Sequence, residues 1–129
     1  MQIAHIAVWT ERLETLRDFY AAYFGAEVGE KYVNPAKGFE SYLVRFGDGC
    51  ALELMSRTDI RIRPAAPVLG FCHLAFGCAG RDEVLARTER LRAAGVRIVV
   101  EPRVTGDGYF ESVAEDPDGN LLELTCTCE

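Results

Sequence analysis

The fold of this chain is indicated by two stretches of similar pattern: residues 5–28, HIAVWTERLETLRDFYAAYFGAEV, and residues 73–98, HLAFGCAGRDEVLARTERLRAAGVRI. Each opens on a histidine in a short strand-like run, continues as an amphipathic helix and stops at a glycine. The histidines lie 68 residues apart, and the helix-ending glycines lie 70 residues apart. Landmarks that recur at such a steady separation indicate an internal repeat.

Helical spacing of apolar residues defines the two predicted helices. The first carries Leu13, Leu16, Tyr20 and Phe24 before Gly25, and the second carries Val84, Leu85, Thr88 and Leu91 before Gly95. Three extended segments follow each helix, at 27–32, 40–46 and 50–56 in the first half and at 96–100, 109–115 and 121–126 in the second. The loops FGDGC and DPDGN contain Asp-Gly, which suits tight hairpin turns. Each half thus predicts a βαβββ module, and the whole chain an α+β fold.

The expected organisation is one domain spanning residues 1–129, with module 1 at about 1–56, a linker at 57–69 and module 2 at about 70–129. A half of about 60 residues is marginal as an independent fold, so the two modules should pack together.

Composition narrows the possible partners. The formal net charge of −6, without a basic stripe, argues against nucleic acid and anionic membrane surfaces as partners. The N-terminal residues show neither a signal peptide nor a long apolar span. Five cysteines are an odd number and do not indicate a disulfide framework. We therefore expect a cytoplasmic protein with reduced cysteines.

Two glutamates stand between leucines in strand-like runs, Glu53 in CALELM and Glu123 in LLELT, 70 residues apart. Strand side chains alternate between faces, so each glutamate points away from its flanking leucines. By the same alternation, His5 and His73 point away from the apolar residues beside them. An isolated buried carboxylate is costly, and a counter-charge is therefore expected.

Two imidazoles and two carboxylates meeting at one point would form an N₂O₂ site for a divalent ion. We predict His5, Glu53, His73 and Glu123 as the ligands of one ion, Zn²⁺ or Ni²⁺ first, with Co²⁺, Mn²⁺ or Fe²⁺ as alternatives. A hydrogen-bonded core histidine or an edge-strand glutamate would be the ordinary reading of any one of them alone. Their matching places in a repeat favour the metal site.

The segments HIAVWT, LELM, HLAF and EDPDGNLLEL resemble the vicinal oxygen chelate superfamily, which includes glyoxalase I, bleomycin-resistance proteins and extradiol dioxygenases. The resemblance covers almost the whole chain and implies paired βαβββ modules that form a curved mixed sheet around a metal. It also implies a homodimer, with modules paired within a chain or across subunits. The ligand order His5, Glu53, His73, Glu123 is similar to glyoxalase I, which isomerises a hemithioacetal of methylglyoxal and glutathione.

The resemblance implies a metal-dependent lyase or isomerase of the lactoylglutathione lyase type. It would move a proton through a metal-stabilised ene-diolate of a small hemithioacetal or α-hydroxycarbonyl substrate. Glu123 is the expected base, with Glu53 as ligand or partner acid, and the reverse assignment stays open because the repeat makes the two equivalent.

The predicted substrate wall consists of Trp9, Met55, Arg57 and Phe71, which share strand faces with the ligands or lie next to them. Glutathione-using glyoxalases usually carry Arg where this chain has Trp9, and Asn where it has Arg57. Glutathione or another thiol adduct therefore stays open as the substrate. The alternatives are an epimerase or thiol transferase of the same superfamily, or a drug- or metabolite-binding protein without catalysis.

Overall fold

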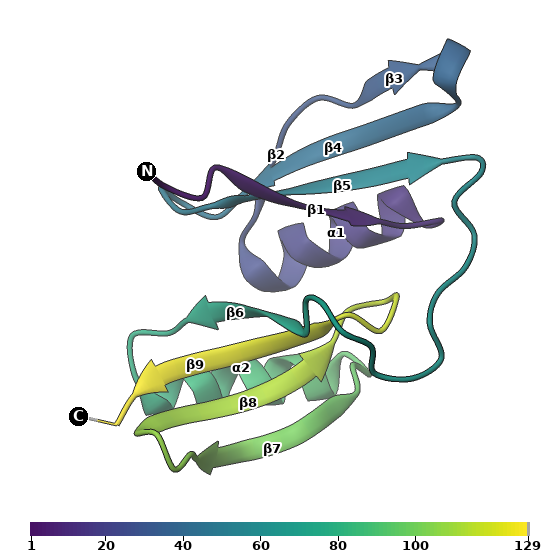
Figure 1. Cartoon of the computed structure of the whole chain (residues 1–129). Coiled ribbons are helices and arrows are strands. Elements are labelled where there is room, and N and C mark those ends of the chain that lie inside the picture. The colour runs from purple at the N-terminus through teal and green to yellow at the C-terminus, as the bar shows by residue number, and fades with distance from the viewer. Residues whose placement is uncertain (129) are drawn as a thin grey trace. The chain divides into compact units, whose positions relative to one another are not determined.

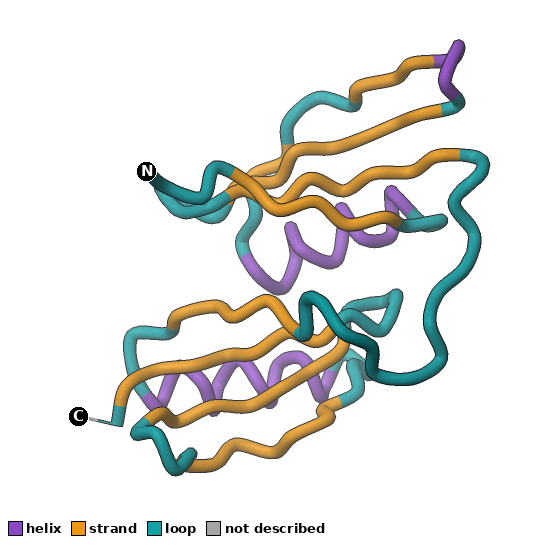
Figure 2. Tube along the Cα trace, viewed as in Figure 1, coloured by secondary structure: helices purple, strands orange, loops and turns teal. Residues whose placement is uncertain are grey.

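The computed structural model describes residues 1–128. It divides into two compact units, Met1–Ala66 and Pro67–Glu129, and each is described by itself. Each unit contains one α-helix and one sheet, and unit 1 carries a short 3₁₀ helix in addition. Figures 1 and 2 show the helix of each unit lying along its own sheet. The predicted α+β class is confirmed. Unit 2 has the predicted βαβββ order, whereas unit 1 has one strand more after its helix than predicted. No helix within residues 1–128 has the length and apolar character needed to cross a membrane.

Unit 1 builds a five-stranded mixed sheet. Its elements are β1 (His5–Trp9), α1 (Leu13–Phe24), β2 (Glu27–Val28), β3 (Tyr32–Asn34), the 3₁₀ helix η1 (Pro35–Lys37), β4 (Phe39–Arg45) and β5 (Ala51–Arg57). The strand order is β1-β5-β4-β2, and β3 also pairs with β4. Only the β1–β5 pair is parallel.

Unit 2 repeats this plan with one strand fewer. Its elements are β6 (His73–Gly77), α2 (Arg81–Ala93), β7 (Ile98–Val104), β8 (Tyr109–Glu115) and β9 (Leu121–Thr127). The order β6-β9-β8-β7 matches the path in unit 1, and β6 and β9 form the single parallel pair.

The strand predicted at residues 27–32 is instead two short strands, β2 and β3. Val28 pairs with Val44, but Tyr32 pairs with Ser41, so this segment uses one residue more than β4 does. The extra residue breaks the ladder, as in a β-bulge. The amide of Gly29 still donates to the Leu43 carbonyl at 3.0 Å.

One face of each sheet packs against its own helix. In unit 1, Leu16 and Tyr20 of α1 are fully buried, as are Val44 and Leu54 of the sheet. The helix ends at Gly25, whose φ of 64° is the left-handed conformation predicted for a C-terminal glycine.

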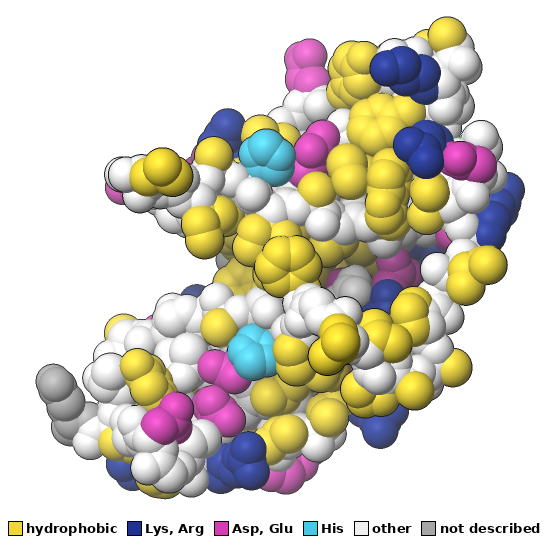
Figure 3. Space-filling view, in the orientation of Figure 1, with side chains coloured by type: hydrophobic (Ala, Val, Ile, Leu, Met, Phe, Trp, Pro, Cys, Tyr) yellow, Lys and Arg dark blue, Asp and Glu magenta, His cyan; other side chains and the backbone are white. Residues whose placement is uncertain are grey.

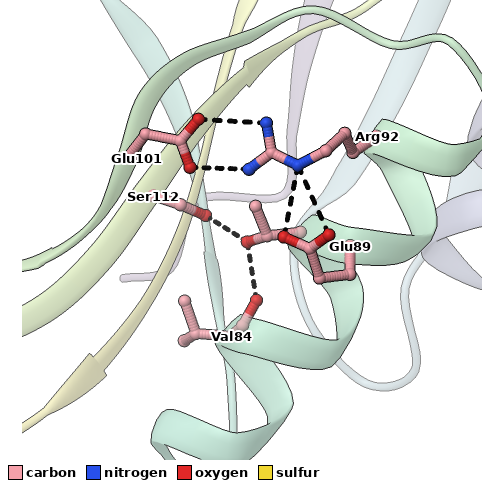
Figure 4. Close-up of polar contacts among 6 residues, drawn as sticks. Val84, Glu89, Arg92, Glu101 and Ser112 are labelled. Atoms are coloured by element: carbon pink, nitrogen blue, oxygen red, sulfur yellow. Dashed lines mark hydrogen bonds and ion pairs between the residues drawn. The ribbon is translucent and has the colours of Figure 1, made fainter.

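In unit 2, Thr88 of α2 is fully buried. Its hydroxyl donates to the Val84 carbonyl at 2.6 Å and is hydrogen-bonded to the Ser112 hydroxyl at 2.7 Å (Figure 4). Leu85 was expected on the buried face but is 44% exposed. The buried positions Val84, Thr88 and Leu91 follow the i, i+4, i+7 spacing. Leu85 directly follows Val84, so it lies at the edge of this buried face.

Candidate metal-binding site

The sheet face opposite each helix carries the predicted ligands. Along β1, His5, Ala7 and Trp9 are exposed, whereas Ile6 and Val8 are half-buried. Along β5, Glu53 alternates with the buried Leu52 and Leu54. The same alternation in β9 places Glu123 between the buried Leu122 and Leu124. The prediction that the leucines face the core and the glutamates the other side agrees with this burial pattern.

Unit 1 brings His5 and Glu53 together across the β1–β5 ladder. Ala7 is the register partner of Glu53, so His5 reaches it from one step away on the same strand face. The His5 Nε2 atom lies 3.7 Å from Glu53 Oε2, and the two side chains are 52% and 27% exposed.

Unit 2 brings His73 and Glu123 together in the same way. Ala75 is the register partner of Glu123, as Ala7 is of Glu53. The His73 Nε2 atom lies 3.3 Å from Glu123 Oε2, and these side chains are 39% and 15% exposed. Figure 3 shows both histidines, in cyan, at the surface with acidic side chains beside them.

These separations can be compared with those of ligands on one ion. Two atoms that bind the same ion at about 2.1 Å lie about 3.0–3.4 Å apart in octahedral or tetrahedral geometry. The His73–Glu123 separation falls within that range, and the His5–Glu53 separation exceeds it by a few tenths of an ångström. Both pairs therefore fit a divalent ion in donor chemistry, but only the His73–Glu123 pair also fits in spacing. Within residues 1–128, no group of three or more His, Cys, Asp or Glu side chains forms a metal site, so each pair offers two ligands.

A second carboxylate lies beside Glu123. Burial raises the pKa of Glu123, and the charge of Glu111 raises it further, while His73 acts in the opposite direction. The Glu111 carboxylate is itself only 14% exposed and lies 3.6 Å from the Arg103 guanidinium. Unit 1 has no such acid at the equivalent place. Thr125 and Met55 each follow the glutamate of their strand by two residues, and the residue opposite Thr125 is Glu111, whereas the residue opposite Met55 is Ser41. Strand alternation places Glu111 on the same sheet face as Glu123, but no local pattern in the sequence indicates its contact with Arg103.

The loop before β9 is held by Asp116, a residue of the EDPDGN segment. Its Oδ1 atom accepts hydrogen bonds from the amides of Asp118 and Asn120, both at 2.9 Å. Its Oδ2 atom accepts a third, at 2.8 Å, from the Asn120 side chain. Asp116 is 4% exposed, and Gly119 supplies the positive φ of 82° that the turn needs. This turn sets where β9 begins and therefore where Glu123 lies.

Three of the four predicted substrate-wall residues lie on the ligand face of unit 1. Trp9 pairs with Met55, one step beyond Ala7 and Glu53, and Arg57 follows on β5. The Arg57 guanidinium lies over the Trp9 ring, 5.1 Å from its centroid, and is paired with Asp59 at 2.5 Å. Phe71 lies in the loop before β6 and is almost fully exposed. Its role in the wall stays a prediction.

Sequence reasoning missed an aromatic neighbour of Trp9, Phe39, and a third ring, Tyr32, which contacts Phe39. The Phe39 ring lies 6.2 Å from the Trp9 ring in an edge-to-face arrangement, and the Tyr32 ring lies 6.0 Å from Phe39. Strand alternation in residues 39–45 could have placed Phe39 on one face, but not against Trp9, since that contact depends on the pairing of β4 with β5.

A family model described as the Glyoxalase/Bleomycin resistance protein/Dioxygenase superfamily matches residues 2–124. The uncharacterized protein YqjT of Bacillus subtilis (strain 168) is 30% identical over 126 residues, with coverage of 93% of this chain and 94% of that protein. Biphenyl-2,3-diol 1,2-dioxygenase 2 of Rhodococcus globerulus is 25% identical over 126 residues, which cover 95% of this chain and 61% of that protein.

Among solved structures, glyoxalase I from Zea mays superposes with a TM-score of 0.81 at 23% identity, over 99% of this chain. At that identity the likeness shows the fold alone. The chain spans only 45% of the maize protein and 61% of the Rhodococcus dioxygenase. This chain belongs to the glyoxalase, bleomycin resistance and dioxygenase superfamily, and the resemblance read from its motifs is confirmed.

Proposed function

We propose that the chain is a divalent-metal-dependent lyase or isomerase of the glyoxalase I type. The observation that carries the proposal is the repeated histidine–glutamate pair, with nitrogen-to-oxygen separations of 3.7 Å and 3.3 Å. We propose that His5, Glu53, His73 and Glu123 share one ion, Zn²⁺ or Ni²⁺ before Co²⁺, Mn²⁺ or Fe²⁺. Such an ion, when bound, would act as a Lewis acid toward adjacent oxygens of the substrate.

Glu123 is the proposed base, and in that role it would leave the ion to reach the substrate. It is the less exposed of the two glutamates, and burial with the Glu111 charge raises its pKa. A carboxylate whose pKa is shifted upward is a stronger base for removing a proton from carbon. It would take the proton from the carbon beside the carbonyl and return it to the neighbouring carbon. His5 and His73 would stay in place as neutral ligands, and Glu53 would act as a ligand or as the partner acid.

The substrate class is a small hemithioacetal or α-hydroxycarbonyl compound. Glutathione is one possible thiol, although Trp9 and Arg57 stand where glutathione-using relatives carry other residues. Arg57 is already paired with Asp59, which reduces its availability to a substrate carboxylate.

Metal analysis and an isomerase assay test the proposal together. Protein purified without chelators should contain about one divalent ion per chain, whether the two modules pair within a chain or across subunits. It should convert the methylglyoxal–glutathione hemithioacetal, or a hemithioacetal of another thiol, to the thioester. Glu123→Gln should abolish this conversion, while Glu101→Gln, which changes an exposed carboxylate paired with Arg92, should leave it unchanged. A metal-free protein with no activity after Zn²⁺ or Ni²⁺ is added would contradict the proposal and favour a binding protein.

A ring-cleaving dioxygenase is the second candidate, supported by the similarity to the Rhodococcus protein. Non-haem iron oxygenases commonly use two histidines and one carboxylate, which leaves open positions for substrate and oxygen. A fourth protein ligand, as proposed here with Glu53, leaves fewer positions open. Oxygen uptake with biphenyl-2,3-diol and Fe²⁺ would support the dioxygenase, and we expect none.

A homodimer in the cytoplasm completes the proposal. The five cysteines are all free, which suits a reducing compartment. The dimer rests on the resemblance to other small members of the superfamily. Sedimentation of the purified chain would test it.

A further inference from the structure

An aromatic cluster lies on the ligand face of unit 1. It consists of Trp9, Phe39 and Tyr32. The ring centroid of Phe39 lies 6.2 Å from that of Trp9 and 6.0 Å from that of Tyr32. The Trp9 side chain is 39% exposed and that of Tyr32 is 55% exposed. Rings that contact one another and still present this much surface offer a ready platform for another ring.

The cluster is continuous with the His5–Glu53 pair. Trp9 pairs with Met55, whereas Ala7 pairs with Glu53, so the cluster begins one step further along the same face. Two residues along a strand span about 7 Å, which is the length of a small substituted ring. A substrate whose oxygens lie beside Glu53 would therefore place a ring attached next to those oxygens against Trp9.

The second repeat shows that the fold does not require this cluster. The step that pairs Trp9 with Met55 in unit 1 pairs Gly77 with Thr125 in unit 2. The unit 2 sheet forms with no side chain at the equivalent position. An exposed tryptophan at this place in unit 1 is therefore better explained by a ligand than by the packing of the sheet.

The charge at the cluster favours a neutral ring over an anion. The nearby guanidinium of Arg57 lies over the Trp9 ring, 5.1 Å from its centroid, and is paired with Asp59. A substrate carboxylate would have to displace Asp59, but a ring can stack on Trp9 or Phe39 without breaking an ion pair.

We infer that Trp9, Phe39 and Tyr32 form a subsite for an aromatic ring of the substrate, adjacent to its oxygens. This inference rests on the proposed function and narrows its substrate class to aryl-substituted hydroxycarbonyl compounds or their thiol adducts.

Two matched probes test the inference. 2-Hydroxyacetophenone and hydroxyacetone carry the same hydroxyketone and differ only by a phenyl in place of a methyl group. Trp9 is the single tryptophan of the chain, so its fluorescence reports binding at the cluster directly. With Zn²⁺ present, the phenyl probe should quench this emission saturably, with N-acetyltryptophanamide as the control for collisional quenching and light absorption. Hydroxyacetone should bind at least about tenfold more weakly, because it lacks the stacking ring.

Two variants assign the binding to the cluster. Phe39→Leu should weaken binding of the phenyl probe about threefold to tenfold and leave hydroxyacetone unaffected. Val33 follows Tyr32, pairs with Glu40 and points to the opposite face of the strand. Val33→Ala should therefore leave the binding of both probes unaffected. Circular dichroism of each variant would show that the fold is retained.

The inference is overturned if the probes bind equally, if quenching does not saturate, or if Phe39→Leu and Val33→Ala behave alike. It is also overturned if dilution alone changes the Trp9 emission together with the sedimentation coefficient, since a second copy would then cover the cluster. Saturable phenyl-specific binding without isomerase activity would instead support the subsite and contradict the proposed reaction. Isomerase activity with equal binding of the two probes would support the proposed reaction and contradict the aromatic subsite.

Discussion

The two histidine–glutamate pairs hold equivalent places in the repeat, yet their surroundings differ. Glu123 is 15% exposed and lies 3.3 Å from His73, while Glu53 is 27% exposed and lies 3.7 Å from His5. Beside Glu123 lies a second acid, Glu111, and beside Glu53 the sheet continues into the aromatic cluster of Trp9, Phe39 and Tyr32. Strand register places a histidine–glutamate pair at the equivalent position of both units, whereas the neighbouring side chains differ. We expect unit 2 to supply the base and unit 1 to select the substrate.

The largest expected effect comes from removing the proposed base. Glu123→Gln should lower kcat by about 10²–10⁴-fold, the usual contribution of a positioned general base. Glu53→Gln should lower kcat less, with a larger share of its effect on metal content. Steady-state kinetics on metal-saturated protein measure kcat for both variants, and elemental analysis measures their metal content. Equal losses of kcat would mean that the two glutamates share the proton transfer.

Removal of either histidine should weaken metal binding strongly. His5→Ala and His73→Ala should each lower the affinity for Zn²⁺ at least about 100-fold, since even the partners of metal ligands contribute 10- to 100-fold. Competition with a chromophoric chelator measures this loss. If His5→Ala had no effect while His73→Ala did, the two pairs would not share one ion, and the four-ligand centre would be wrong.

The turns before the two glutamate strands should differ in their contribution to stability. Asp116 accepts three hydrogen bonds in the β8–β9 turn. Its counterpart loop contains the exposed Asp48, and there the amide of Gly49 donates to the Phe46 carbonyl at 3.2 Å. Asp116→Ala should lower the free energy of unfolding by about 2 kcal/mol, because hydrogen bonds to a charged acceptor are lost. Asp48→Ala should change it little, and urea denaturation compares the two.

The smallest effect concerns pH in the metal-free protein. Because the pKa of Glu123 is raised above 4.5, the native state holds this proton more tightly than the unfolded chain does. The free energy of unfolding therefore falls as pH rises from about 4.5 through the folded pKa. Glu123→Gln removes this loss, so the variant should gain stability over the wild type at neutral pH and lose that advantage in acid. An advantage that is independent of pH would contradict the raised pKa.

The repeat, the helices and most strands could be predicted because their signals are local. Helical spacing, glycine stops and strand alternation depend on neighbours within a few residues. The exposed Leu85 and the divided β2–β3 segment were missed, since each depends on how an element meets its sheet. In the first hairpin loop, the positive φ lies at Gly47 rather than at the glycine of the Asp-Gly pair. Loop length and register decide that choice, not the dipeptide.

By itself, the sequence determined the βαβββ repeat, the family, and the face on which His5, Glu53, His73 and Glu123 lie, because alternation and periodicity are properties of the backbone. Only the tertiary structure decided that Glu111 lies beside Glu123, and that Phe39 and Tyr32 form a cluster with Trp9. Those contacts link residues on different strands or across a turn. They depend on the register of the sheets, which no local pattern in the chain specifies.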